Sequence, residues 1–450
     1  MSIVEKSITD FLSNEYKEFA MYSIEGRAIP SVIDSFKVSQ RKIIHISNKI
    51  WKTGKEKTIK VFQLCGKVSS DAFYHHGDAS LSNAIVVIAQ RFKNNAPLLE
   101  EDGQFGSLRT PQAGAPRYIG TKLSDNFRLS YKDFDLLTYK EEEGEIIEPE
   151  FFLPIIPMIL INGSSGIAVG FSSNILNRDV KEVVKSVVDV LNGKKIKELK
   201  PYSPYFKGEC VQDENNNKRW ISRGIYTKEG SNSIRITELP MSITYEKYEI
   251  ILDKLLEDRE ILSYVDNCKD NIDYTIRFKR GILDTLTETQ ITKMFKLEEY
   301  NTEIFTTLDE NNKLKIFEST VEIIEYFVNF RLKYYHKRKE LLLSRIKGDL
   351  KILSNRGRFI KFILDGKLQV NNVKKDIIIS NVEKLGLDKN NGGYDYLLKM
   401  PIYSLTNELY EKLKQDFTYK KEEQNRISSI YPKDMYLDDL KEIKNNFKYE

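Results

Sequence analysis

The stretch YHHGDASL (residues 74–81) places two adjacent histidines before a glycine. It is followed by AQRF (89–92), by the glycine loop DGQFGS (102–107) and by APRY (115–118). Apolar residues at helical spacing predict a helix over 81–92, and glycine and proline mark the two later segments as turns. A lone short motif is only a hypothesis. A histidine loop, a glycine loop and an Arg-Tyr pair in this order indicate one composite site.

Upstream of the histidines, the chain is locally basic. Residues 37–60 hold eight lysines and arginines and a single acid, Glu56, although the formal charge of the whole chain is only +4. Such a run is typical of a phosphate-contacting surface, and the alternative is a solvated helix face. Short apolar stretches alternate with these cations over residues 30–77. This pattern predicts short helices in a helix-turn-helix module.

The length of the chain and the change in residue pattern along it predict a multidomain α+β protein. A chain of 450 residues that is 40% hydrophobic is too long for one ordinary core, and two to four domains are expected. We expect a helical arm at 1–27, the helix-turn-helix domain with the quoted motifs at 28–149, a mixed α/β domain at 150–320, and a helical region at 321–450.

Within 150–320, strand-like runs alternate with helical ones. MILI (158–161), SIRITEL (233–239) and DYTIRF (273–278) are expected to be strands, and residues 245–256 a helix. DENNN (213–217) and DENN (309–312) are expected to be hairpin turns.

The last segment has a regular apolar seam. Its members are Tyr335, Leu342, Ile346, Leu350 and Leu353, spaced by seven, four, four and three residues. That spacing predicts a long antiparallel coiled coil. A return helix is expected from about residue 406, with a small globule between the two arms.

Several other chemistries lack their motifs. The sequence has no Walker-type phosphate loop, no HExxH, no Cys/His cluster and no GxSxG elbow. The three cysteines are distant from one another and lack CxxC spacing, which favours a reducing compartment. Asp133 and Asp135 could hold magnesium, but no third carboxylate is near, and we expect no metal site in this chain.

Features of secreted or membrane proteins are also missing. The N-terminal MSIVEKSITDF carries charges where a signal peptide needs an apolar core. The longest apolar run, 153–161, holds two prolines and is far short of the ~20 residues of a membrane span. We therefore expect a cytoplasmic protein without a membrane partner.

Taken together, the motifs resemble the DNA-cleaving core of the breakage-and-rejoining subunit of type IIA DNA topoisomerases. The resemblance extends upstream through GRAIPSVIDSFKVSQRKII (26–44). Downstream it continues through IEPEFFLPIIPMILINGSSGIAVGFSSNI (147–175) and TELP (237–240). It covers essentially the whole chain, and the length and the YHHGxxSL form are similar to bacteriophage members. It implies a winged-helix cleavage domain at 28–149, a tower domain at 150–320, and a coiled coil with a dimerising C-gate at 321–450.

The resemblance implies that Tyr118 attacks DNA and forms a 5′-phosphotyrosyl link. A phenol with a pKa of ~10 is a poor nucleophile at neutral pH and needs cationic neighbours. Arg117 adjoins it, and a guanidinium suits phosphate oxygens. By the same resemblance His76 would hydrogen-bond the scissile phosphate or relay a proton, and Arg41 would complete the clamp.

Other residues are expected to hold the DNA. Lys42, Lys49 and Lys60 are candidates for backbone contacts. Ile167, in GSSGIAVG (163–170), would by family match insert between base pairs and bend the duplex, and the alternative is a core residue after a strand. Two positions depart from the family. Leu176 stands where proline is frequent, and Ala79 replaces a quinolone-contacting serine, which puts quinolone sensitivity in doubt.

The resemblance also implies what other chains supply. ATP hydrolysis and the acidic magnesium cluster belong to another part of the family's machinery, so an ATPase/Toprim partner subunit is expected to bind ATP and Mg²⁺. Two tyrosines are needed to cut both strands of double-stranded DNA, which implies a homodimer. Because the sequence contains no basic β-pinwheel, we expect relaxation and decatenation rather than negative supercoiling.

Two other functions remain open. A non-catalytic architectural DNA binder would explain the basic run and the coiled coil, but not the order of the HHG and RY loops. A tyrosine recombinase or relaxase would use different arrangements of arginine and histidine and would need no partner for magnesium.

Overall fold

A computed structural model describes residues 7–269, 271–401 and 406–448. The chain forms two compact units, one of residues 1–331 with 438–450 and the other of residues 332–437. Among the described residues, no helix is both long enough and apolar enough to cross a membrane.

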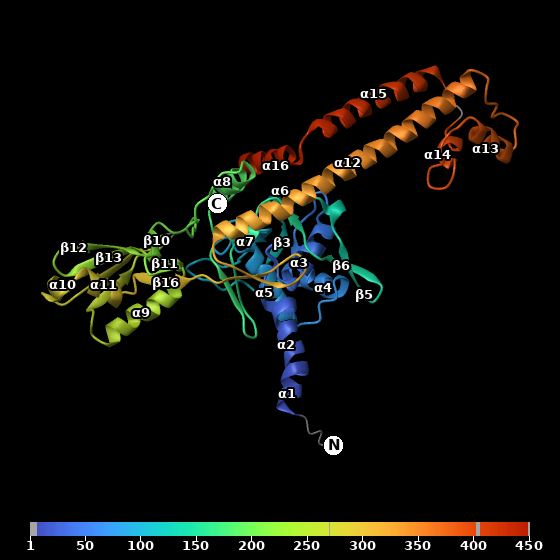
Figure 1. Ribbon diagram of the computed structural model, residues 1–450. Coiled ribbons are helices and arrows are strands. Elements are labelled where there is room, and N and C mark those ends of the chain that lie inside the picture. Colours follow the sequence, from blue (N-terminus) through green and yellow to red (C-terminus); the bar gives the residue numbers. More distant parts are fainter. Residues whose placement is uncertain (1–6, 270, 402–405, 449–450) are drawn as a thin grey trace. The chain divides into compact units, whose positions relative to one another are not determined.

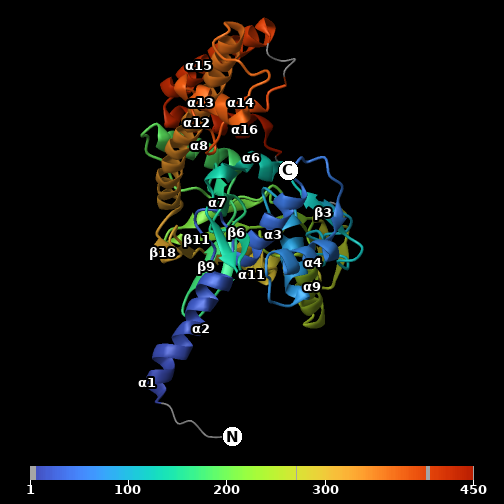
Figure 2. The same ribbon diagram turned by 90° about the vertical axis from the view of Figure 1, so that its right-hand side faces the viewer.

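The N-terminal arm is helical from Ile8 to Ala28. It consists of α1 (Ile8–Phe11), the π-helical η1 (Leu12–Tyr16), α2 (Lys17–Met21) and the π-helical η2 (Tyr22–Ala28). The side chain of Ser7 accepts a hydrogen bond from the backbone N–H of Asp10 and caps the first turn. Figures 1 and 2 show the arm projecting away from the helices that follow it in the sequence. Only its last segment buries side chains.

A small helical core with one sheet follows the arm. It comprises α3 (Val38–Ile50), α4 (Val61–Asp71) and α5 (Asp78–Ala89), with β1 (Ile59–Lys60), β2 (Leu99–Asp102) and β3 (Gly120–Leu123) in the antiparallel order β1-β3-β2. Ile43 and Ile44 from α3 and Ile85 from α5 are fully buried, so the apolar positions do face one core. The predicted helix over 81–92 begins earlier, after Gly77, and ends before Phe92.

The next elements lead out of this core. They are α6 (Asp125–Ser130), β4 (Tyr131–Lys132), the 3-10 helix η3 (Phe134–Leu136), β5 (Tyr139–Glu142), β6 (Glu145–Pro149), β7 (Leu153–Pro154), α7 (Met158–Ile161), β8 (Ser164–Ile167), β9 (Ser172–Ile175) and α8 (Val180–Leu191). Three antiparallel strand pairs, β4–β7, β5–β6 and β8–β9, lie along this segment.

The structure overturns the strand predicted for MILI. Met158–Ile161 is the helix α7, and all four side chains are buried. Periodicity cannot distinguish a short, fully apolar strand from a buried helical turn. The turn is closed by Asn162, whose backbone N–H donates to the Met158 carbonyl and whose side chain makes two hydrogen bonds to the backbone of Ala96.

A mixed α/β layer follows within the first unit. Its strands are β10 (Glu209–Asp213), β11 (Asn216–Arg223), β12 (Ile225–Glu229), β13 (Ser233–Glu238), β14 (Ser263–Asp266), β15 (Tyr274–Arg277), β16 (Glu298–Thr302), β17 (Phe305–Leu308) and β18 (Leu314–Phe317), and its helices are α9 (Tyr245–Glu257), α10 (Ile282–Thr285) and α11 (Glu288–Met294). The strands predicted from SIRITEL and DYTIRF are confirmed as β13 and β15. Both predicted hairpin turns are confirmed between β10 and β11 and between β17 and β18.

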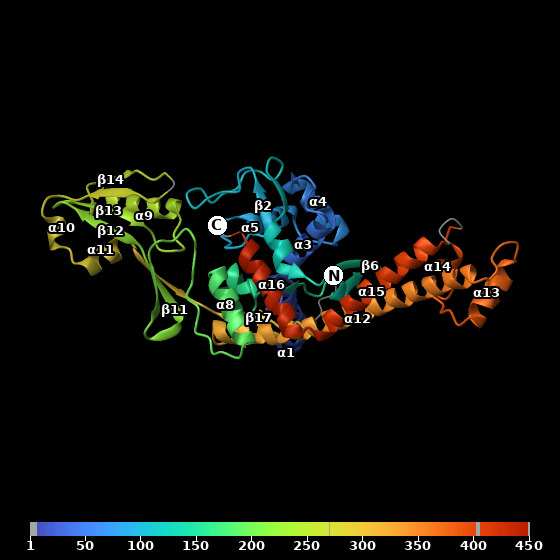
Figure 3. The same cartoon turned by 90° about the horizontal axis from the view of Figure 1, so that it is seen from above.

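The four-stranded sheet β12-β13-β15-β14 carries the core of this layer (Figures 1 and 3). Ile234 pairs with Ile276, and Ile236 pairs with Tyr274. These side chains share one buried cluster with apolar residues of α9 and α11. Alternation along the strands therefore places the helices on a single face of the sheet.

The second unit is helical. Within it lie most of α12 (Thr320–Leu364), then α13 (Lys375–Lys384), α14 (Asp395–Leu398), α15 (Asn407–Ser429) and the start of α16 (Pro432–Asn446). Ile346 and Leu350 from the predicted seam pack with Ile427 and Phe417 of α15, and Figure 3 shows α12 and α15 side by side. A separate small core around α13 and α14 contains Val382 and Leu397.

Candidate active site

Tyr118 stands on a loop that is anchored on both sides. Its backbone N–H donates to the Ala115 carbonyl, and the carbonyls of Pro116 and Ile119 accept from the first two residues of α4. The Nζ atom of Lys60 donates to the Tyr118 carbonyl at 2.8 Å. The tyrosine side chain is nevertheless 72% exposed. The fold thus fixes the backbone and leaves the phenol free to meet a ligand.

The glycine loop explains why the motifs occur as a set. Gly106 has a φ of +92°, and a Cβ there would lie 2.5 Å from the Pro111 carbonyl oxygen. Only glycine permits this conformation and this close approach. The Gln90 side chain then donates to the Phe105 carbonyl at 2.7 Å, and the Gly114 N–H donates to the Gln104 carbonyl. DGQFGS therefore supports the loop that carries Tyr118.

Arg117 is exposed beside Tyr118. It lines an open pocket of about 710 Å³ together with Asp78 and Ala79 from the first turn of α5.

The histidine pair lies at the start of α5, on an adjacent cavity. His76 is exposed, and its Nε2 atom lies 2.7 Å from the hydroxyl of Tyr22 on η2. Its ring packs edge-on against Tyr74, with centroids 5.3 Å apart. The Nε2 atom of His75 lies 3.5 Å from a carboxylate oxygen of Glu142. These side chains line a cavity of about 610 Å³.

Arg27 lines the same cavity and is exposed. It lies in η2, the π-helical end of the arm, five residues after Tyr22. π-helical turns are frequent at functional sites, and here the turn brings an arginine and the hydroxyl bound to His76 to one cavity. The motif GRAIP does not by itself reveal this role, because no residue pattern shows which way the guanidinium points.

Arg41, which was expected to complete the phosphate clamp, lies inside the fold. This side chain is only 3% exposed. Its Nε and Nη2 atoms donate to the two carboxylate oxygens of Asp34 at 2.7 and 3.1 Å. Burial opposes the charge, but the charge and hydrogen bonds of Asp34 outweigh burial and raise the pKa of Arg41. An arginine held in this way cannot clamp phosphate without breaking a buried ion pair.

Lys42, which was expected to contact the DNA backbone, is held by internal partners as well. It is 8% exposed, its Nζ atom lies 3.0 Å from a Glu148 carboxylate oxygen, and it donates to the Ala72 carbonyl. It lies against the wall of the histidine cavity but is held by internal partners. Lys49 and Lys60, in contrast, are exposed.

Ile167 is at the end of β8 and is 88% exposed. The core alternative for this residue is therefore wrong. An exposed isoleucine at the tip of a strand pair is available to contact a partner.

Of the two aspartates Asp133 and Asp135, Asp133 forms an ion pair within the protein. Asp133 has a φ of +62°, and its carboxylate accepts a hydrogen bond from the buried Arg331 at 2.6 Å. Across the described part of the chain, no three His, Cys, Asp or Glu side chains gather as metal ligands.

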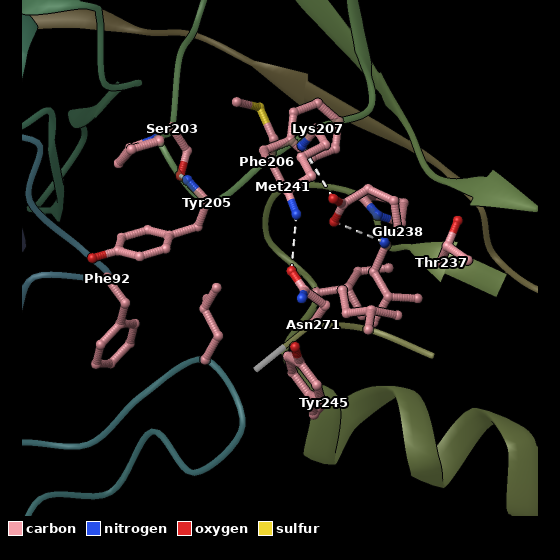
Figure 4. Close-up of a pocket in the computed structure, with 16 residues that line it drawn as sticks. Phe92, Ser203, Tyr205, Phe206, Lys207, Thr237, Glu238, Met241, Tyr245 and Asn271 are labelled. Atoms are coloured by element: carbon pink, nitrogen blue, oxygen red, sulfur yellow. Dashed lines mark hydrogen bonds between the residues drawn. The ribbon is translucent and has the colours of Figure 1, made fainter. Parts of the chain in front are cut away.

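TELP lines a third, smaller cavity of about 180 Å³ (Figure 4). Glu238 is buried there, and its carboxylate accepts from the backbone N–H groups of Lys207 and Leu239. Burial raises the pKa of Glu238 despite these bonds. Figure 4 also shows the Lys207 side chain bonded to Asn271. The motif thus joins β13 to neighbouring loops.

Comparison with known proteins gives one consistent result. Residues 27–442 match the family of the A-type subunits of DNA gyrase/topoisomerase IV. The DNA topoisomerase medium subunit of Enterobacteria phage T4 is 31% identical, with 99% of this chain and 100% of the phage protein aligned. The mitochondrial DNA topoisomerase 2 of Dictyostelium discoideum is 35% identical over 98% of this chain.

A solved structure agrees with these sequences. The DNA-binding, cleavage and re-ligation domain of Plasmodium falciparum topoisomerase II superposes with a TM-score of 0.85 at 32% identity, covering 97% of this chain and 64% of that one. The Plasmodium falciparum and Dictyostelium relatives are longer proteins, and this chain spans 35% of each.

Proposed function

This chain belongs to the family of the A-type subunits of DNA gyrase/topoisomerase IV, and from that premise we propose that it is the DNA-cleaving and religating subunit of a type II DNA topoisomerase, an ATP-dependent isomerase. The observation that carries the proposal is the exposed Tyr118, on an anchored loop beside Arg117. An adjacent open cavity is lined by His76 and by Arg27 of the π-helical η2.

In the proposed reaction, the phenol oxygen of Tyr118 attacks a backbone phosphorus. A Tyr–O–P bond forms, the P–O3′ bond breaks, the phenol loses its proton, and the 3′ oxygen gains one. One phosphate ester replaces another, so resealing by the reverse step needs no ATP. Arg117 and Arg27 stabilise negative charge on the phosphate, and His76 hydrogen-bonds the phosphate or relays the proton.

DNA binding and bending involve other exposed side chains. Lys49 and Lys60 contact the backbone, where each neutralised phosphate adds salt-dependent affinity. Ile167 inserts between base pairs, and unstacking that costs ~ a few kcal/mol is offset by a bent duplex that contacts more protein. Its 88% exposure supports this role.

Further parts of the proposal concern partners. We assign residues 28–149 to a winged-helix cleavage domain, 150–320 to a tower domain and 321–450 to a coiled coil with a dimerising C-gate, so that two copies cut both strands. An ATPase/Toprim subunit would bind ATP and Mg²⁺, and that ion would supply further charge neutralisation at the phosphate. The expected location is the cytoplasm of a host cell, as fits the phage relative.

The decisive experiment is Tyr118→Phe, which removes the nucleophile and keeps the ring. Mixed with the partner ATPase subunit, Mg²⁺ and supercoiled DNA, the wild-type protein should yield protein-linked DNA after a detergent quench. Tyr118→Phe should give none and bind DNA with unchanged affinity. Adducts formed by Tyr118→Phe would falsify the proposal. An architectural DNA binder would give no adducts with either protein.

A further inference from the structure

The hairpin that carries Ile167 rests on the end of the N-terminal arm. Ala168, the residue after Ile167, packs against Ile24 and Ile29 at the end of the arm and against Leu308 of β17. β8 contacts η2 directly, and Figure 2 shows β9 beside the arm. The tip of this hairpin therefore has a defined support at its base.

Gly166 makes the closest contact in this support. A Cβ at this position would lie 2.1 Å from the carbonyl oxygen of Ala28 and 3.2 Å from the Nζ atom of Lys37. Its φ is not in the left-handed region, so glycine is needed here for space rather than for conformation. Any larger residue must push the hairpin away from the arm.

Lys37 fastens the same contact from the side. Its Nζ atom donates to the Ser165 carbonyl at 2.6 Å. Burial lowers the pKa of this lysine, as expected for an ammonium group that is removed from water. Lys37 is the residue that precedes α3, so it ties the hairpin to the helical core as well as to the arm.

The contact between Gly166 and Ala28 joins the chain neighbours of two side chains that have proposed functions. On one side Ile167 follows Gly166, and on the other side Arg27 precedes Ala28. The same π-helical segment carries Tyr22, whose hydroxyl is hydrogen-bonded to His76. A displacement of the hairpin is therefore transmitted to the residues that line the histidine cavity.

We propose that Gly166 and Lys37 are positioning residues that lock the Ile167 hairpin to the Arg27 end of the arm, so that DNA bending and phosphate capture occur as one movement. This inference rests on the proposed function. It adds a coupling between Ile167 and the histidine cavity, and it explains why Gly166, the second glycine of GSSGIAVG, is needed.

Two variants and one matched control test the coupling. Gly166→Ala inserts a methyl group against the Ala28 carbonyl. Lys37→Met keeps most of the side-chain packing and removes the hydrogen bond to Ser165. Gly170→Asn is the control, because this glycine lies in the same hairpin with nothing within 4 Å of its Cβ position, and asparagine tolerates its φ of +74°.

The first measurement uses the DNA-free protein and does not depend on any cleavage activity. Hydrogen exchange of the backbone amides of η2 should become faster in Gly166→Ala and in Lys37→Met, and should be unchanged in Gly170→Asn. Unchanged exchange in both test variants would overturn the mechanical link. If the wild-type protein formed no adducts, the proposed function would fail, and this measurement would still decide whether the link exists.

The second measurement compares DNA bending, by energy transfer between labelled ends, with adduct yield. In Gly166→Ala bending should persist while adducts fall roughly 10–100-fold, as for a reactive group displaced by about 1 Å. A parallel loss of bending and adducts would show that Gly166 only holds Ile167, and unchanged adducts would also overturn the proposal.

Lys37→Met keeps the test valid if Gly166→Ala fails to fold. Adducts should fall while the slope of log affinity against log salt stays constant. A slope reduced by about one would identify Lys37 as a phosphate contact instead, and that result would contradict the positioning role.

Discussion

Helix α3 and the last segment of the arm, η2, each contribute one cation to the lining of the histidine cavity, Lys42 and Arg27 respectively, but their cations differ in exposure. On α3, Arg41 and Lys42 are buried and held by Asp34 and Glu148. On η2, Arg27 is exposed. The number of cations on a segment therefore does not show how many can reach a phosphate. Whether a cation can reach a phosphate depends on whether the fold places a carboxylate beside it.

The strongest test of this contrast is Arg41→Ala. Removing one partner of a buried ion pair leaves Asp34 uncompensated, and we expect the free energy of unfolding to fall by about 3–5 kcal/mol. Urea denaturation followed by circular dichroism measures the change. Lys49→Ala, on the exposed part of the same helix, is the control and should stay within about 0.5 kcal/mol of wild type. A variant with wild-type stability that forms no adducts would return Arg41 to the phosphate clamp.

Arg27→Ala should have the opposite signature. Adduct formation should fall by roughly 10²–10³-fold, as when a positioned charge donor is lost from a transition state, while the unfolding transition is unchanged. Single-turnover cleavage with the partner subunit present measures the rate, and Arg27→Lys should recover part of it because a point charge replaces the planar fork. A rate within twofold of wild type would remove Arg27 from the site.

A third test uses His45, which lies on the buried side of α3. Burial first, and then the charges of Lys49 and Lys42, lower its pKa from 6.5 to about 4. Within the described residues its Nε2 atom has no hydrogen-bond partner. Above pH 6.5 His45 is neutral in both the folded and the unfolded chain. Below pH 6.5 His45 binds a proton in the unfolded chain but not in the folded chain, so the free energy of unfolding decreases as the pH falls from 6.5 towards 4.

We expect this loss to be on the order of 2 kcal/mol. Thermal unfolding at pH 7 and pH 5 should show a larger decrease for wild type than for His45→Gln, which cannot titrate. Equal decreases in the two proteins would mean that His45 is protonated in the folded state.

The sequence predicted short helices over 30–77, where α3 and α4 lie, a helix over 81–92 that overlaps α5, and the strands β13 and β15, because their apolar residues have the period of these structures. Both hairpin turns were predicted from clustered Asp and Asn. It did not distinguish the helix Met158–Ile161 from a strand, because four consecutive apolar residues fit either. The motif order singled out the loops of His76 and of Arg117 and Tyr118, and the roles of these residues stay predictions. The burial of Lys42 could not be predicted, because its partner Glu148 lies about a hundred residues further along the chain.

The smallest expected effect concerns Tyr22, whose hydroxyl contacts His76 from the exposed arm. Tyr22→Phe keeps the ring, which covers Gly26 at 3.2–3.3 Å from its Cβ position, and removes only the hydrogen bond. A neutral hydrogen bond contributes about 1 kcal/mol, so cleavage should slow by about three- to tenfold and DNA affinity should not change. Tyr74→Phe is the matched control, since Tyr74 contacts His76 through its ring. If both variants slow cleavage equally, the hydroxyl of Tyr22 has no specific part in orienting His76, and the arm contributes only Arg27 to the cavity.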